Sequence, residues 1–129
     1  NHDSSLMQKT FNMMTHETAR VFMSIAKIDH ILWKANTYYS AVTTTEQFKL
    51  VDHKDCRLGK WYYEGEGKKD FSNSIHYKEL EAPHAVVHDA TKKVYDLIAD
   101  ENIDLDKIFE VFKGMEESSH KIFSTLDSI

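Results

Sequence analysis

Two histidines, His84 and His88, are four residues apart in a segment that predicts a helix. This spacing puts both imidazoles on one face, about one turn apart, as a two-point metal clamp requires. The same face carries Val87, Thr91 and Ile98, so we expect it to point into the protein. The pair is interpreted as metal ligands, with two ordinary core or surface histidines as the alternative.

Two further residues add metal-ligating groups: His30, on an apolar stripe beside Trp33, and Cys56, the single cysteine. Taken alone, a histidine on an apolar face is more often a hydrogen-bonded core residue. A lone cytosolic cysteine is usually a small buried hydrophobic residue. Together with the His84–His88 pair, however, they supply three imidazoles and one thiolate, a set that zinc favours and that fills its tetrahedron.

The spacing of these residues resembles the motif of the chemoreceptor zinc-binding family, Hx[WFYL], CxLGxW and HxxxH. The three parts are His30-Ile31-Leu32, the run from Cys56 to Trp61 (Cys-Arg-Leu-Gly-Lys-Trp), and the segment 84–88. The Leu-Gly-x-Trp run after the cysteine is the specific part, because zinc chemistry alone does not require it. The resemblance implies four zinc ligands: His30, Cys56, His84 and His88.

Membership would also imply a function. Members of this family are cytosolic helical bundles that form homodimers in bacterial signalling proteins, at the ends of soluble chemoreceptors or beside diguanylate cyclase domains. They sense zinc, or oxidants such as hypochlorous acid through the zinc-bound cysteine. The chemistry fits a switch, because a thiolate is both a zinc ligand and the form that oxidants attack. Nearby, Asp52 and Asp55 are candidates for orienting a ligand imidazole, and His53 is a candidate competing ligand.

Three other functions compete with a non-catalytic zinc-binding sensory domain. A hemerythrin-like di-iron or oxygen-binding bundle also uses HxxxH, but needs more histidines and bridging carboxylates, and leaves Cys56 unexplained. A purely structural dimerisation bundle would need no metal. A zinc hydrolase is disfavoured because Ala85, Val86 and Val87 fill the interior of the pair, where HExxH carries its general base.

The elements that must position these residues are predicted to be helices, since the chain has only 4 Gly and 1 Pro. A long helix over about 4–38 carries two apolar stripes, one starting at Met7 and one containing Ala19, Met23, Ala26, His30 and Trp33. One stripe is expected to face the bundle, and the other a second copy of the chain or an adjoining helix. Shorter helices are predicted over 46–51, 56–64 and 71–80, with a loop over 64–70.

Pro83 is expected in the first turn of a second long helix that ends near residue 99, and Asp104 is expected to cap the last helix. The predicted fold is all-α, an antiparallel four-helix bundle with additional short helices in one domain over 1–129.

Length, composition and charge limit the class of protein, its partners and its compartment. The chain has 129 residues, 41% apolar and 29% charged, with a net charge of −5. These values predict one globular domain and argue against nucleic acid or an anionic membrane as the main partner. No run is long and apolar enough to span a membrane, and no signal peptide is recognised. One cysteine favours the reducing cytoplasm. Because the sequence starts without Met, we expect it to be part of a longer signalling protein.

Overall fold

The computed structural model describes residues 2–128, with side chains of 2–4, 11, 12 and 14–16 excepted. The described chain is helical, which confirms the all-α prediction. Its five helices are α1 (His2–Thr43), α2 (Arg57–Tyr63), α3 (Glu66–Phe71), α4 (Ile75–Ile98) and α5 (Leu105–Ser128). None of them combines the length and apolar character that crossing a bilayer requires.

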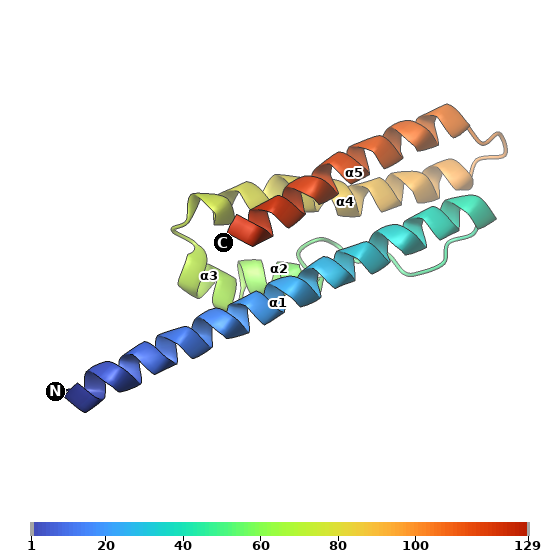
Figure 1. Cartoon of the computed structure of the whole chain (residues 1–129). Coiled ribbons are helices and arrows are strands. Elements are labelled where there is room, and N and C mark those ends of the chain that lie inside the picture. Colours follow the sequence, from blue (N-terminus) through green and yellow to red (C-terminus); the bar gives the residue numbers. More distant parts are fainter. Residues whose placement is uncertain (1, 129) are drawn as a thin grey trace.

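The three long helices form the body of the bundle (Figure 1). Helices α1 and α4 run in the same direction, and α5 runs antiparallel to both. The chain returns from the end of α1 to the start of α4 through residues 44–56, which we call the return segment, and through α2 and α3. These short elements therefore take the place that a long second helix has in an up-and-down bundle.

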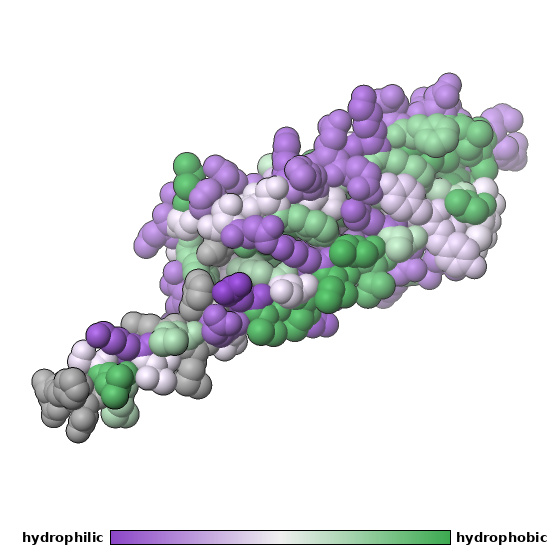
Figure 2. Space-filling view, viewed as in Figure 1, coloured by the Kyte–Doolittle hydropathy of each residue, from purple (hydrophilic) through white to green (hydrophobic). Residues whose placement is uncertain are grey.

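Helix α1 is apolar on two sides, as its sequence predicts, and the structure assigns each side. Met23, Ala26 and His30 are buried against the rest of the chain. The other stripe is solvent-exposed, with 60% exposure at Val21 and 56% at both Ile28 and Leu32. A space-filling view shows apolar surface along α1 (Figure 2). The side chains of Phe11 and Met14, expected on the exposed stripe, lie outside the described residues.

The helix predicted over 46–51 is wrong, because this part of the return segment is not helical. Several of its backbone groups form hydrogen bonds with side chains of the long helices instead. The hydroxyl of Tyr95 donates to the Phe48 carbonyl (2.6 Å) and lies 3.3 Å from the Phe48 N–H, which donates to it. The Gln47 N–H donates to Ser40 Oγ (3.0 Å). Because Tyr95 is 47 residues away from Phe48, the helix propensity of residues 46–51 cannot reveal this contact.

Two boundaries near the middle of the chain also differ from the prediction. Part of the expected loop over 64–70 is helix α3, where Gly67 lets the Trp61 ring lie against the backbone. Pro83 does not start a helix but lies inside α4, which begins after its N-cap Ser74. Proline leaves the carbonyl of Glu79 without its helical partner, and Glu79 is on the exposed side, where water can supply one. The Asp104 cap is confirmed, since its carboxylate accepts from the Lys107 N–H (3.2 Å).

Candidate metal centre

The structure brings all four residues predicted as ligands into one cluster. His30 lies on α1, Cys56 is the N-cap residue of α2, and His84 and His88 lie on successive turns of α4. Their ligand atoms all lie within 4.8 Å of one another. Donor atoms bound to a tetrahedral zinc ion lie roughly 3.3–3.8 Å apart, so a small contraction suffices for a metal to be held.

Hydrogen bonds orient two of the imidazoles for this purpose. The Nδ1 atom of His30 lies 2.8 Å from the Ala26 carbonyl, and that of His88 lies 2.7 Å from the Val51 carbonyl. A carbonyl only accepts, so each Nδ1 must carry the proton and each Nε2 keeps its lone pair. Both Nε2 atoms are buried without a hydrogen-bond partner. A buried acceptor of this kind is costly unless it is satisfied, and a metal ion would satisfy both.

Burial also keeps the imidazoles uncharged, which is the form that binds metal. Desolvation, with a smaller contribution from the neighbouring His30 and His88, lowers the pKa of His84 to about 2. Burial likewise lowers the pKa of His88 to about 4, against the opposing effect of its bond to Val51. The pKa of His30 is lowered mainly by burial as well. All three rings are therefore neutral near pH 7.

Cys56 is held at the entrance to α2, with its Sγ 3.2 Å from Nε2 of His84. The sulfur accepts from the Gly59 N–H (3.4 Å), and the thiol can donate to the His53 carbonyl (3.5 Å). Burial raises the pKa of the thiol, while the backbone N–H groups of Gly59 and Leu58 act in the opposite direction. A cation beside the sulfur would favour the thiolate and reverse the effect of burial.

The Leu-Gly-x-Trp run after the cysteine has a packing function. Leu58 is fully buried in the core. A Cβ on Gly59 would lie 2.0 Å from the His53 carbonyl oxygen, so the return segment can cross α2 only over a glycine. Trp61 stacks on Phe22 of α1, with ring centroids 5.2 Å apart. Leu58 thus fixes α2 in the core, Gly59 lets the return segment cross it, and Trp61 connects it to α1.

A cavity of about 510 Å³ opens onto the cluster and is lined in part by His30, Cys56 and His88. Asp29 and Arg57, also in its lining, form an ion pair (3.2 Å) that links α1 to α2. The cavity offers a route by which an ion or a small oxidant can reach the sulfur.

Sequence reasoning missed the groups that orient the rings. The carbonyls of Ala26 and Val51, rather than the carboxylates of Asp52 or Asp55, accept from His30 and His88. A backbone carbonyl leaves no signature in a sequence. His53, considered as a competing ligand, lies next to the cluster but is outside the set of four.

Three neutral imidazoles and a thiol that converge inside a helical bundle define a metal-binding domain. The sequence model of the family described as "Chemoreceptor zinc-binding domain" matches residues 30–95, just over half of the chain. The chain therefore belongs to the chemoreceptor zinc-binding domain family, which confirms the resemblance, and its cofactor is zinc. This family is regulatory and not a known catalytic one. No significant match was found among curated proteins or among solved structures.

Proposed function

We propose that this chain is a single cytoplasmic sensory domain that regulates an adjoining output domain of a chemoreceptor or a diguanylate cyclase. In this proposal, His30, Cys56, His84 and His88 are the four zinc ligands. The observation that carries it is the convergence of their donor atoms around two otherwise unpartnered Nε2 atoms. Four protein ligands leave no position for a reactive water, which favours regulation over catalysis.

The same cluster argues against the di-iron alternative. Among the described residues, the group of four ligand-type side chains contains a thiol and no carboxylate. Di-iron bundles need glutamates that bridge their metals, so the donor set here fits one zinc ion better.

The signal in this proposal is oxidation of Cys56. A zinc ion held by the four residues would favour the Cys56 thiolate, and this thiolate would react with hypochlorous acid to give a sulfenic acid and chloride, so that sulfur loses two electrons and chlorine gains them. The sulfenic acid is a weaker ligand, and the zinc-mediated link between α2 and the long helices is lost. Zinc contributes on the order of 10 kcal/mol in small structural sites, and a fraction of this is enough to shift a bistable bundle.

We expect the purified protein to contain one zinc ion per chain, and one equivalent of hypochlorous acid to weaken its zinc binding. Elemental analysis and transfer of zinc to a chromophoric chelator measure the two effects. The Cys56→Ala variant is expected to show no change with oxidant, because its sulfur is gone. Equal oxidant effects on both proteins would remove Cys56 from the mechanism, and absence of zinc from the wild type would refute the site.

The exposed stripe of α1 favours a second copy of the chain as partner. Its positions follow the heptad pattern of a coiled coil, in steps of four and three, and all but the half-buried Ile25 are exposed: Val21, Ile25, Ile28, Leu32, Ala35, Tyr39 and Val42. A row of large apolar side chains this long on a helix is typical of an interaction surface. A symmetric pair of α1 helices would bury the stripe from both sides.

We expect an Ile28→Glu/Leu32→Glu variant to be monomeric at concentrations at which the wild type is a dimer, because it places charges at the centre of the seam. Analytical ultracentrifugation measures this. Phe109→Glu is the matched control, since Phe109 is a comparably exposed apolar residue on α5. A wild-type monomer, or equal loss of the dimer in both variants, would contradict a seam on α1.

A further inference from the structure

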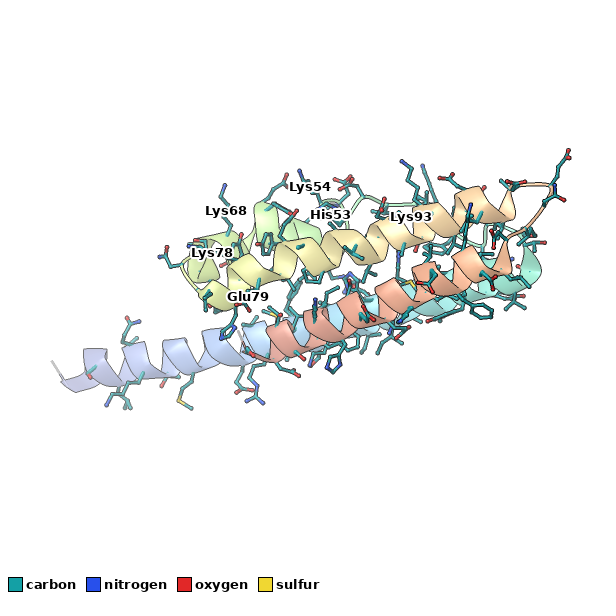
Figure 3. All side chains as sticks on the ribbon, turned by 90° about the horizontal axis from the view of Figure 1, so that it is seen from above. His53, Lys54, Lys68, Lys78, Glu79 and Lys93 are labelled. Carbon is teal, nitrogen blue, oxygen red and sulfur yellow. The ribbon has the colours of Figure 1, made fainter. Side chains whose placement is uncertain are left out.

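A fourth imidazole, that of His53, lies beside the cluster without belonging to it. Its side chain is only 16% exposed. The Nε2 atom lies 3.1 Å from the Glu81 carboxylate, and the Nδ1 atom lies 3.4 Å from that of Asp52. His53 sits on the return segment alongside α4 (Figure 3). Unlike His30 and His88, it is held by carboxylates and not by carbonyls.

The ring of His53 lies slightly farther from the nearest rings of the cluster than those rings lie from one another. Its centroid lies 5.5 Å from that of His84 and 6.4 Å from that of His88. Within the cluster, the His30 ring lies 4.9 Å from His84 and 5.6 Å from His88. A movement of the return segment toward His84 is needed to bring this imidazole among the donor atoms.

His53 and Cys56 also share one short piece of chain. The His53 carbonyl contacts the Cys56 sulfur (3.5 Å), and the turn between them is closed by the Asp55 N–H on the Asp52 carbonyl (2.9 Å). Nothing helical constrains residues 49–55. A movement that withdraws the sulfur from the cluster can thus bring the imidazole of the same turn toward it.

The ties that hold His53 in place are weak compared with a metal bond. Asp52 belongs to the same turn, so among the described residues Glu81 is the one polar partner of the ring on another element, beside ring contacts with Tyr63 of α2 and the two histidines of α4. Glu81 and Asp52 are 42% and 60% exposed, and ion pairs in contact with solvent contribute little. A divalent ion with a vacant coordination position competes with them easily, because a neutral imidazole is a preferred zinc ligand.

We propose that His53 is a reserve ligand, which takes the fourth position on the metal when the sulfur of Cys56 leaves it. The ion is then held by four imidazoles, from His30, His53, His84 and His88. This inference rests on the zinc site proposed above. It changes the outcome of oxidation, because the domain would exchange one ligand for another and retain the ion at lower affinity.

A double-mutant cycle tests this proposal. Zinc affinity is measured by chelator competition for the wild type, His53→Ala, Cys56→Ala and the double variant. We expect His53→Ala to change the dissociation constant less than about threefold when Cys56 is present. In the Cys56→Ala background it should raise that constant about tenfold or more, as loss of a direct ligand does. X-ray absorption should show four nitrogen or oxygen ligands in Cys56→Ala, with one imidazole fewer in the double variant.

The His53→Gln variant separates ligation from packing. Glutamine keeps a polar side chain between Asp52 and Glu81, so a purely structural role for His53 would be rescued by it, and ligation would not. Equal effects of His53→Ala in both backgrounds, or rescue by glutamine, would overturn the reserve ligand while leaving the zinc site intact. A wild type that binds no zinc would instead refute the site itself.

Discussion

Replacing His84 with alanine is expected to weaken zinc binding by about 100-fold to 1,000-fold. His84 lies at the centre of the cluster, with its Nε2 beside the sulfur and its ring 4.9 Å from the rings of both His30 and His88. Structural zinc sites are worth about 10–16 kcal/mol, or roughly 2.5–4 kcal/mol for each of four ligands. Each 1.4 kcal/mol corresponds to a factor of about ten in affinity. Chelator competition measures the change.

The stability of the protein gives a second measure of the same variant. Without metal, His84→Ala leaves a cavity where a fully buried ring was packed, so we expect the metal-free variant to unfold at a lower temperature than the metal-free wild type. With excess zinc, the wild type should be stabilised by about 4 kcal/mol at 1,000 times its dissociation constant, and the variant far less. His76→Ala is the control, because His76 lies on the same helix and pairs with Glu79. An equal response of both variants to zinc would contradict His84 as a ligand.

The candidate site was predictable because much of its signal lies in short sequence motifs. The interval from His84 to His88 forces two rings onto one face once the segment is helical, and the Cys-x-Leu-Gly-x-Trp run specifies how α2 packs. The two apolar stripes of α1 were likewise predicted from the helical spacing of its apolar residues. What the pattern could not state is which stripe faces inward, because that depends on the shape of the α4–α5 pair.

One part that sequence analysis missed depends on a partner far along the chain. Residues 46–51 are predicted to form a short helix, yet the Tyr95 hydroxyl binds the backbone of Phe48 from 47 positions away. Pro83 has the profile of a helix start, but Ser74 caps the helix earlier and the proline ring is buried in α4. At 46–51 a tertiary contact outweighs the local preference, whereas at Pro83 an earlier N-cap moves the start of the helix.

One helix carries both proposed activities, which explains how a change at the metal can reach a partner. His30 faces inward to the cluster, and Leu32, two residues later, lies on the exposed stripe. Helix α1 is tied to α5 by polar contacts, among them Lys34 with Glu116 (3.2 Å) and Tyr38 with Glu116 (2.6 Å). Any shift of α1 that follows loss of a zinc ligand is therefore also a shift of the heptad surface.

We expect the Gly59→Ala substitution to lower the stability of the domain more than the small volume of a methyl group suggests. In Gly59→Ala, the new Cβ would lie 2.0 Å from the His53 carbonyl oxygen and 2.7 Å from the Lys54 carbonyl group, all backbone atoms that cannot rotate away. Alanine favours a helix over glycine by about 1 kcal/mol, but overpacking of this kind costs about 1–3 kcal/mol, and a clash with backbone belongs at the upper end. We expect a net loss of stability, measured by urea unfolding of the metal-free protein.

The same substitution should also weaken zinc binding, by about tenfold or more, because the displaced turn carries Cys56 and the Val51 carbonyl that orients His88. Gly114→Ala in α5 is the matched control, since no atom lies within 4 Å of its added Cβ. There the gain in helix propensity is unopposed, and we expect about 0.5–1 kcal/mol of added stability with unchanged zinc affinity. If the two alanines stabilised the protein equally, the return segment would not cross α2 at Gly59, and the packing explanation of the Leu-Gly-x-Trp run would fail with it.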